Sequence, residues 1–292
     1  MSVVQRETRR RVRILLLPGT AWISLLYVVP AALILAYSFL TPRIGGGVEW
    51  DPSLDAYREL LAGNARASYY NGYVTVLVRS VVLAAATTAI CLGLALPLAM
   101  FISRRRSAIA KNALLVAVMI PFWTSLLVRT YAMRYLLANT GPLNEFLENL
   151  GYERQAFLNT RFAVLLGLVY TALPFMVLPL YASVERVDGR LLEAGRDLGA
   201  SARKVFLTVF IPLIRAGITV GCVMVFVISV SQFLVPTLLG GGKVNMVANL
   251  LEQEFGEAFN WPLGAAIALF FSALTLFSLW LVVGRREQEE FL

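Results

Sequence analysis

Long apolar runs alternate with shorter polar gaps along most of the chain. A helix needs about 20 apolar residues to cross a bilayer. The pattern predicts six such spans, over residues 21–40, 74–102, 113–137, 162–181, 213–238 and 262–284. We therefore expect an all-α membrane protein with six transmembrane helices. Its transmembrane domain covers residues 21–284, between an N-terminal segment, 1–20, and a tail, 285–292.

The polar gaps contain residues that break helices. We expect residues 41–73, 138–161 and 239–261 to be external loops, with a short helix near Leu54 to Leu61 in the first of them. Pro174 and Pro179 fall inside the fourth span, where they are expected to kink it.

Composition supports the membrane assignment. Of the 292 residues, 58% are hydrophobic and 15% are charged, whereas soluble domains carry about 25% charged residues. The mean hydropathy is +0.71. The length suits one membrane domain and leaves no room for an added nucleotide-binding domain.

The net charge of +8 reports topology rather than nucleic-acid binding. Cytoplasmic loops of membrane proteins carry an excess of Lys and Arg. Of the 26 basic residues, 17 fall in the N-terminal segment, after the second span, between Arg186 and Arg215, and in the tail. This distribution predicts a multi-pass membrane protein with both termini in the cytoplasm.

The chain lacks the residues that most catalytic or metal sites use. It has no histidine, which excludes zinc–imidazole sites and Ser-His or Cys-His pairs. Cys91 and Cys222 lie inside apolar runs, where a small packing role is expected. We predict no catalytic residue, no metal site and no cofactor in this chain.

One polar gap, residues 185–212, has a sharper pattern. Arg190 to Leu198 has apolar positions at helical spacing, and Gly199 interrupts it. Apolar positions resume at Ala202 and continue to Val209, and Pro212 closes the segment. This pattern predicts a helix, a glycine turn and a second helix that ends at the proline. Read alone, it also fits an amphipathic loop on the membrane surface.

The spacing of this segment resembles the EAA loop of ABC-importer permeases. Glu193-Ala194-Gly195 is followed by three residues, Gly199, nine residues and then Val209 to Pro212, with Gly195 where a second alanine is usual. The resemblance implies the type I ABC importer permease fold, in which this loop is a pair of cytoplasmic coupling helices docked into a cleft of an ATPase. It assigns ATPase coupling to Glu193, Ala194, Gly195, Gly199, Val205, Phe206, Val209 and Pro212.

Other segments are similar to permeases of the spermidine/putrescine importer group. They are Pro121 to Tyr131 (PFWTSLLVRTY), Gly240 to Lys243, Leu250 to Phe255 and Trp261-Pro262. This resemblance implies a subunit that forms half of the path for a polyamine. It also implies a second homologous permease, two ATPase subunits that bind ATP and Mg, and a periplasmic solute-binding protein. The location that it implies is the bacterial inner (plasma) membrane.

Candidate residues of the substrate path are aromatic or polar residues in or near the spans. An arginine at membrane depth is costly, so Arg129 should face protein, water or headgroups, and aromatic faces can attract a cation. The full set is Trp123, Arg129, Tyr131, Tyr170, Ser229, Ser231 and Gln232. Gln232 is uncharged where relatives often carry an acid, which leaves another small solute as an alternative.

Two other function classes are disfavoured. An ion-coupled secondary transporter uses charged or ion-coordinating residues at mid-membrane, and the spans offer few. An intramembrane enzyme is disfavoured by the lack of histidine and of mid-membrane carboxylates.

Overall fold

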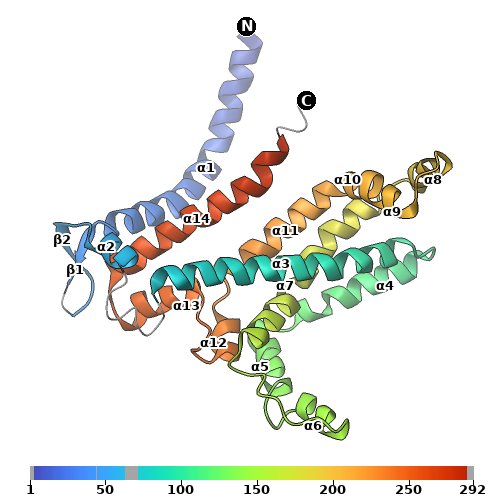
Figure 1. Cartoon of the computed structure of the whole chain (residues 1–292). Helices are drawn as coiled ribbons and strands as arrows, with labels where there is room; N and C mark the ends of the chain where they lie inside the picture. The colour runs from blue at the N-terminus through green and yellow to red at the C-terminus, as the bar shows by residue number, and fades with distance from the viewer. Residues whose placement is uncertain (1–2, 44, 63–71, 288–292) are drawn as a thin grey trace. The chain divides into compact units, whose positions relative to one another are not determined.

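The computed structural model describes residues 3–43, 45–62 and 72–287, which are mostly helical (Figure 1). The chain folds as two compact units. One comprises Met1–Arg66 and Leu251–Ala273, and the other comprises Ala67–Leu250 and Leu274–Leu292.

The first unit combines long helices with a small hairpin. Its elements are α1 (Val3–Tyr37), β1 (Leu40–Pro42), β2 (Val48–Pro52), α2 (Asp55–Ala62), the π-helical turn η4 (Gln253–Glu257) and the first part of α14 (Trp261–Glu287). β1 and β2 pair antiparallel. The short helix expected near Leu54 to Leu61 is confirmed as α2. The hairpin was not expected, and it is the one departure from an all-helical fold among the described residues.

The second unit is built around three helices that lie side by side (Figure 1), namely α3 (Tyr73–Ser103), α7 (Arg161–Val184) and α11 (Arg215–Val230). Its other elements are α4 (Ala108–Met119), η2 (Ile120–Trp123), α5 (Leu126–Leu136), α6 (Pro142–Asn149), α8 (Gly189–Asp197), α9 (Ala202–Val205), the π-helical turn η3 (Phe206–Phe210), α10 (Ile211–Leu213), α12 (Leu234–Gly240) and α13 (Val247–Glu252). α7 stays one continuous helix through Pro174 and Pro179.

Two apolar clusters hold the second unit together. The larger one joins α3, α7 and α11, with Cys91, Ala95, Ala99, Val169, Ala172, Met176, Val177, Leu180, Val184, Phe210, Ile214 and Val225. The smaller one joins α3, α7 and α12, with Leu83, Leu137, Ala163, Val164, Leu168, Val235, Leu239, Val244 and Met246. Cys91 is a packing residue here, as expected, because its buried thiol lies in the larger cluster.

Two glycines allow α11 to approach α7 closely. A methyl group at Gly217 would lie 2.6 Å from the carbonyl oxygen of Pro179, and one at Gly221 would lie 2.6 Å from the sulfur of Met176. The glycines are four residues apart and share a helix face. This is the small-xxx-small pattern that brings membrane helices together when hydrophobic burial cannot.

The predicted spans agree with the helices in four places. Among the described residues, four single helices are long and apolar enough to cross a membrane: Pro18–Tyr37, Tyr73–Ser103, Arg161–Val184 and Trp261–Ser278. Two bent pairs pass the same test when each is taken together, Ala108–Trp123 with Leu126–Leu136 and Ala202–Leu213 with Arg215–Val230. Six spans result where each bent pair counts as one.

The third and fifth spans are not the continuous helices that were predicted. Residues 113–137 contain a bend of 92° between η2 and α5, because Pro121 cannot donate to a helical ladder and Thr124 is extended. Residues 213–238 are interrupted after Val230, and a new helix starts at Leu234. The apolar pattern alone could not reveal these breaks because it continues across them.

A surface ion pair lies beside α6. The Arg154 Nε donates a hydrogen bond to the Glu148 Oε1 over 2.6 Å, and a second nitrogen reaches Oε2 over 3.0 Å. This hydrogen-bonded guanidinium lowers the pKa of the Glu148 carboxyl below its ordinary value. The pair therefore persists at neutral pH and is lost only as the pH falls through that lowered pKa.

The α7–α11 contact can be tested with a side chain added at Gly217. We expect Gly217→Val to destabilise the purified chain by about 2 kcal/mol, because an overpacked helix contact must open. Thermal unfolding in detergent measures this effect. Gly93→Val is the matched control, since a methyl group at Gly93, in α3, meets nothing within 4 Å. Equal melting temperatures for the two variants would contradict the close approach.

Candidate functional site

The segment between α7 and α11 folds as two short helices separated by a turn. The Asp188 carboxylate caps α8 by accepting from the backbone N–H of Arg190 over 3.0 Å. Gly199 has φ of +81°, a left-handed conformation that a side chain would strain. The Ser201 hydroxyl caps α9 by accepting from the Lys204 N–H over 3.3 Å. The predicted helix, glycine turn and second helix are therefore confirmed.

Gly195 lets the two helices touch. A methyl group on Gly195 would lie 3.2 Å from the Val205 side chain and 3.9 Å from that of Val209. An alanine would be a tight fit here, which gives a physical reason for the glycine at this position. Val205 is 3% exposed, so its side chain holds the pair together within this chain rather than facing outward.

Other residues of the pair are open to contact. Glu193 and Ala194 are exposed on α8, whereas Phe206 and Val209 are half-buried. Leu198 is 89% exposed, and Leu191 and Leu207 are also exposed. These three leucines were not among the predicted site residues. A signal for them existed, because large apolar side chains beside a glycine turn in a polar segment are unusual on a water-facing surface.

Pro212 does not end the second helix, contrary to the prediction. The helical stretch continues through it to Leu213, and the chain bends by 68° between Leu213 and Arg215. The wider turn η3 precedes the proline, with the Ile211 N–H bonded to the carbonyl of Phe206. A π-helical turn shifts the hydrogen-bond register, which accommodates a residue that has no N–H.

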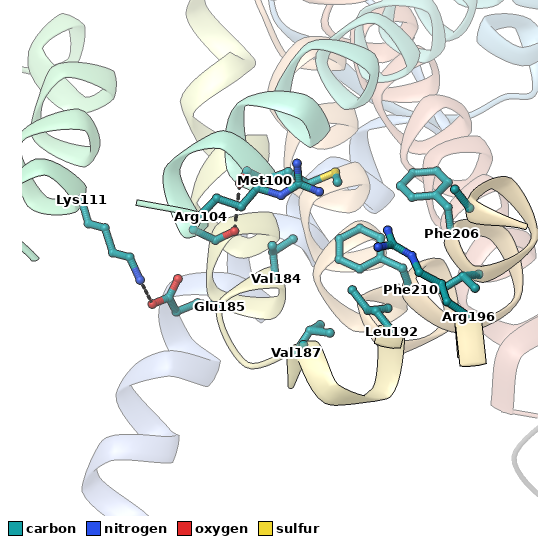
Figure 2. A pocket seen from close by; sticks show the side chains of 14 residues that line it. Met100, Arg104, Lys111, Val184, Glu185, Val187, Leu192, Arg196, Phe206 and Phe210 are labelled. Atoms are coloured by element: carbon teal, nitrogen blue, oxygen red, sulfur yellow. Dashed lines mark hydrogen bonds and ion pairs between the residues drawn. The ribbon is translucent and has the colours of Figure 1, made fainter. Parts of the chain in front are cut away.

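A pocket of about 550 Å³ lies between this pair and the ends of α3, α4 and α7 (Figure 2). Its lining residues are Met100, Ser103, Arg104, Lys111, Val184, Glu185, Val187, Gly189, Leu192, Arg196, Ala202, Val205, Phe206 and Phe210. The Lys111 ammonium and the Glu185 carboxylate form an ion pair of 2.5 Å at its edge.

The candidate path residues lie in three places. Trp123, 86% exposed, precedes α5, which carries Arg129 and Tyr131, and Tyr170 lies on α7. Ser229, Ser231 and Gln232 follow one another at the end of α11. No hydrogen bond joins these three places within the described ranges, and their assignment to one substrate path stays a prediction.

Two of these residues have buried polar atoms without partners. The Nε and Nη1 of Arg129 are buried and unpaired, as is the Ser229 hydroxyl. The Arg129 guanidinium lies 5.5 Å from the centre of the Phe122 ring, which is its one described favourable contact. Ser231, in contrast, donates to the carbonyl of Val227 over 2.9 Å.

A buried acid was missed by the sequence reasoning. Glu254 is 6% exposed and lies in the π-helical turn η4. Among the described residues it is the one acidic side chain in the buried class. Within the same part of the chain, no group of three or more His, Cys, Asp or Glu side chains could hold a metal ion.

These features define a helical membrane protein whose bundle is interrupted by an exposed helix pair with a glycine turn. The chain belongs to the family of binding-protein-dependent transport system inner membrane components, whose family model matches residues 92–283. It is thus an ABC permease subunit, a transport protein rather than an enzyme. The family expected from the spacing is confirmed.

Curated relatives match over most of their length. The chain is 37% identical over 256 residues to the spermidine/putrescine transport system permease protein PotB of Haemophilus influenzae, covering 87% of this chain and 86% of that protein. It is 38% identical over 250 residues to PotB of Escherichia coli K12, with 85% and 88% covered. Identity is 32% over 289 residues to the inner membrane ABC transporter permease protein YdcU of Escherichia coli K12, with 94% and 88% covered.

Solved structures show the same fold at low identity. The chain is similar to one in a bacterial ABC transporter involved in the import of the acidic polysaccharide alginate, with a TM-score of 0.75, 16% identity, and 98% and 99% of the two chains covered. A bacterial alginate ABC transporter in complex with an alginate pentasaccharide-bound periplasmic protein gives a TM-score of 0.73 at 15% identity, with 96% and 95% covered.

Replacement of Arg129 separates a transport role from a structural one. We expect Arg129→Met to raise the free energy of unfolding of the isolated chain by about 1 kcal/mol or more, because the two unpaired buried donors that it removes outweigh the one cation–π contact that is lost. Solute uptake by the assembled transporter should fall severalfold. Arg134→Met, at an exposed position of α5, is the control. A large loss of thermal stability with normal uptake would instead make Arg129 structural.

Proposed function

We propose that this chain is one of two permease subunits of an ATP-driven importer and forms half of its path for a polyamine such as putrescine or spermidine. An external binding protein delivers the solute. The six apolar segments cross the inner membrane, both termini lie in the cytoplasm, and the segment 185–212 lies there too. The described part of the tail ends at residue 287, and residues 288–292 lie outside it.

The observation that carries this proposal is the exposed helix pair at the spacing of the EAA loop. A short helix pair with an open apolar surface is suited to a groove in a partner protein. Leu198 at the turn and Leu191 on α8 supply that surface. Glu193, exposed beside them, supplies polar contacts at the rim. The polyamine assignment is supported by the named PotB relatives.

The work of transport is divided between chains. Two partner ATPases bind ATP and Mg and hydrolyse the nucleotide, and this chain needs no cofactor of its own. Closure of the ATPases moves α8 and α9 together, because Gly195 on α8 packs closely against Val205 on α9. The motion reaches α7 and α11, and this chain and a second homologous permease switch between outward-facing and inward-facing states.

Polar groups along the path contact the solute in transit. Aromatic faces at Trp123, Tyr131 and Tyr170 attract a cation, and the Ser229 hydroxyl and Gln232 can accept its hydrogen bonds. The unpaired guanidinium of Arg129 favours a second candidate, an importer of another small solute in the same family, since a cation repels a cation.

Transport measurements test the function directly. The chain would be reconstituted in liposomes with its second permease, its ATPases and the cognate binding protein, and labelled putrescine would be offered outside. We expect uptake that requires ATP. Uptake that an ion gradient alone drives, without the ATPases, would contradict the importer assignment. ATP-dependent uptake of a different solute, without uptake of putrescine, would support the importer assignment and contradict the polyamine assignment.

The glycine turn gives a prediction for coupling. Gly199→Val should abolish solute-stimulated ATP hydrolysis, because a β-branched residue strains a backbone with φ of +81°. Gly199→Asn should keep most of it, since asparagine tolerates the left-handed region. A methyl group at Gly199 meets nothing within 4 Å, so the effect reports conformation rather than a clash. Equal solute-stimulated ATP hydrolysis by the two variants would show that coupling does not need the left-handed conformation at residue 199.

A further inference from the structure

The pocket behind the helix pair has an unusual balance of charge. Three of its lining residues are cationic, namely Arg104 at the end of α3, Lys111 on α4 and Arg196 on α8. Its one acidic residue, Glu185, is already paired with Lys111. The side chains of Arg104 and Arg196 make no ion pair within the described ranges, so two positive charges of the lining are uncompensated.

The charged residues of the lining come from separate helices. Figure 2 shows the Lys111–Glu185 pair on one side of the pocket and Arg196 beside Phe206 and Phe210 on the other. An excess of basic residues at the ends of spans explains why cations are numerous here. It does not explain why arginines from α3 and α8 line one cavity together.

The rest of the pocket is apolar. Val184 and Phe210 belong to the larger apolar cluster, and Leu192 and Phe206 pack against that cluster. Met100 lines the side next to α3. A wall of this kind disfavours a small hydrated anion, whose desolvation is costly. It favours an amphiphile that carries both a negative group and a hydrocarbon part.

The pocket lies at the ends of two long apolar helices, and the end of a membrane-spanning helix is where it meets the lipid headgroups. The long apolar helices α3 and α7 end at Ser103 and Val184, beside it. Exposed apolar side chains, Phe101 on α3 and Ile109 on α4, lie close to its lining residues along the chain. A hydrocarbon chain leaving the pocket would have an apolar surface to follow.

We propose that this pocket binds the headgroup of an anionic phospholipid. The guanidinium groups of Arg104 and Arg196 donate to the phosphate oxygens, as arginine does in charge-assisted phosphate recognition. The apolar wall takes the glycerol and the start of an acyl chain. A lipid held in this way bridges α3 and α8, and it fastens the helix pair to the membrane domain. The proposal concerns binding alone and does not depend on which solute is transported.

Lipid retention by the purified full-length chain tests this proposal. The probes are phosphatidylglycerol and phosphatidylcholine, each titrated into the detergent-solubilised chain and counted by native mass spectrometry. We expect the double variant Arg104→Gln with Arg196→Gln to retain phosphatidylglycerol roughly tenfold less well than the wild type. Phosphatidylcholine should bind weakly to both.

The control removes the same charge elsewhere. Arg106→Gln with Arg203→Gln changes two exposed arginines that do not line the pocket, and it should retain phosphatidylglycerol as the wild type does. If the first double variant does not fold, Arg196→Gln alone changes an exposed position of α8 and should lower retention about threefold.

Several results would overturn the proposal. Equal losses in the two double variants would show attraction by net charge without a site. Equal retention in all variants would place the lipid elsewhere. Inorganic phosphate that displaces the lipid and stabilises the chain equally well would make the ligand a soluble anion. A cross-link between the Ser103→Cys variant and the ATPase in the assembled complex would show that the ATPase, and not a lipid, occupies the pocket.

Discussion

The close contact of α11 with α7 determines what the helix pair between them can do. Gly217 and Gly221 bring the two backbones together, and the chain that leaves α7 at Val184 returns at Arg215. The segment between them, residues 185–214, is therefore attached at both ends to one packed pair of helices. A force on this segment acts on the ends of α7 and α11. Interfaces packed this tightly shift between discrete arrangements rather than deform continuously.

The second half of this segment, residues 201–214, contains several contacts that stiffen it. Ser201 starts it with a cap, and the Phe206 and Phe210 rings stack at 5.4 Å across the wider turn η3. The π-helical register lets Pro212 sit inside the helical stretch, so the bend falls at Ile214, which is buried. Because Phe210 and Ile214 both belong to the larger apolar cluster, residues 201–214 share one core with α3, α7 and α11.

Apolar length predicted most of the helices because a continuous run of 20 apolar residues has few stable alternatives in lipid. The turn at Gly199 could also be predicted, since a glycine between two helical patterns indicates a left-handed residue. The breaks within residues 113–137 and 213–238 could not be placed, because side-chain hydropathy does not record backbone direction.

The burial of Val205 against Gly195 could not be predicted either. A glycine has no side chain, so the apolar pattern does not mark it as a packing partner. Glu254 was missed because one acid between apolar segments reads as a loop residue until its burial is known.

The buried polar groups limit what the chain can be by itself. The guanidinium of Arg129 has two buried nitrogens without partners, and each unmet donor costs about 1–3 kcal/mol. A lone chain gains nothing from this arrangement, whereas a chain whose path is completed by another subunit or by a solute can supply the missing acceptors. The buried Ser229 hydroxyl at the end of α11 also lacks a hydrogen-bond partner. Unpaired groups of this kind fit the proposed role of the chain, in which it forms one side of a path and a second permease forms the other.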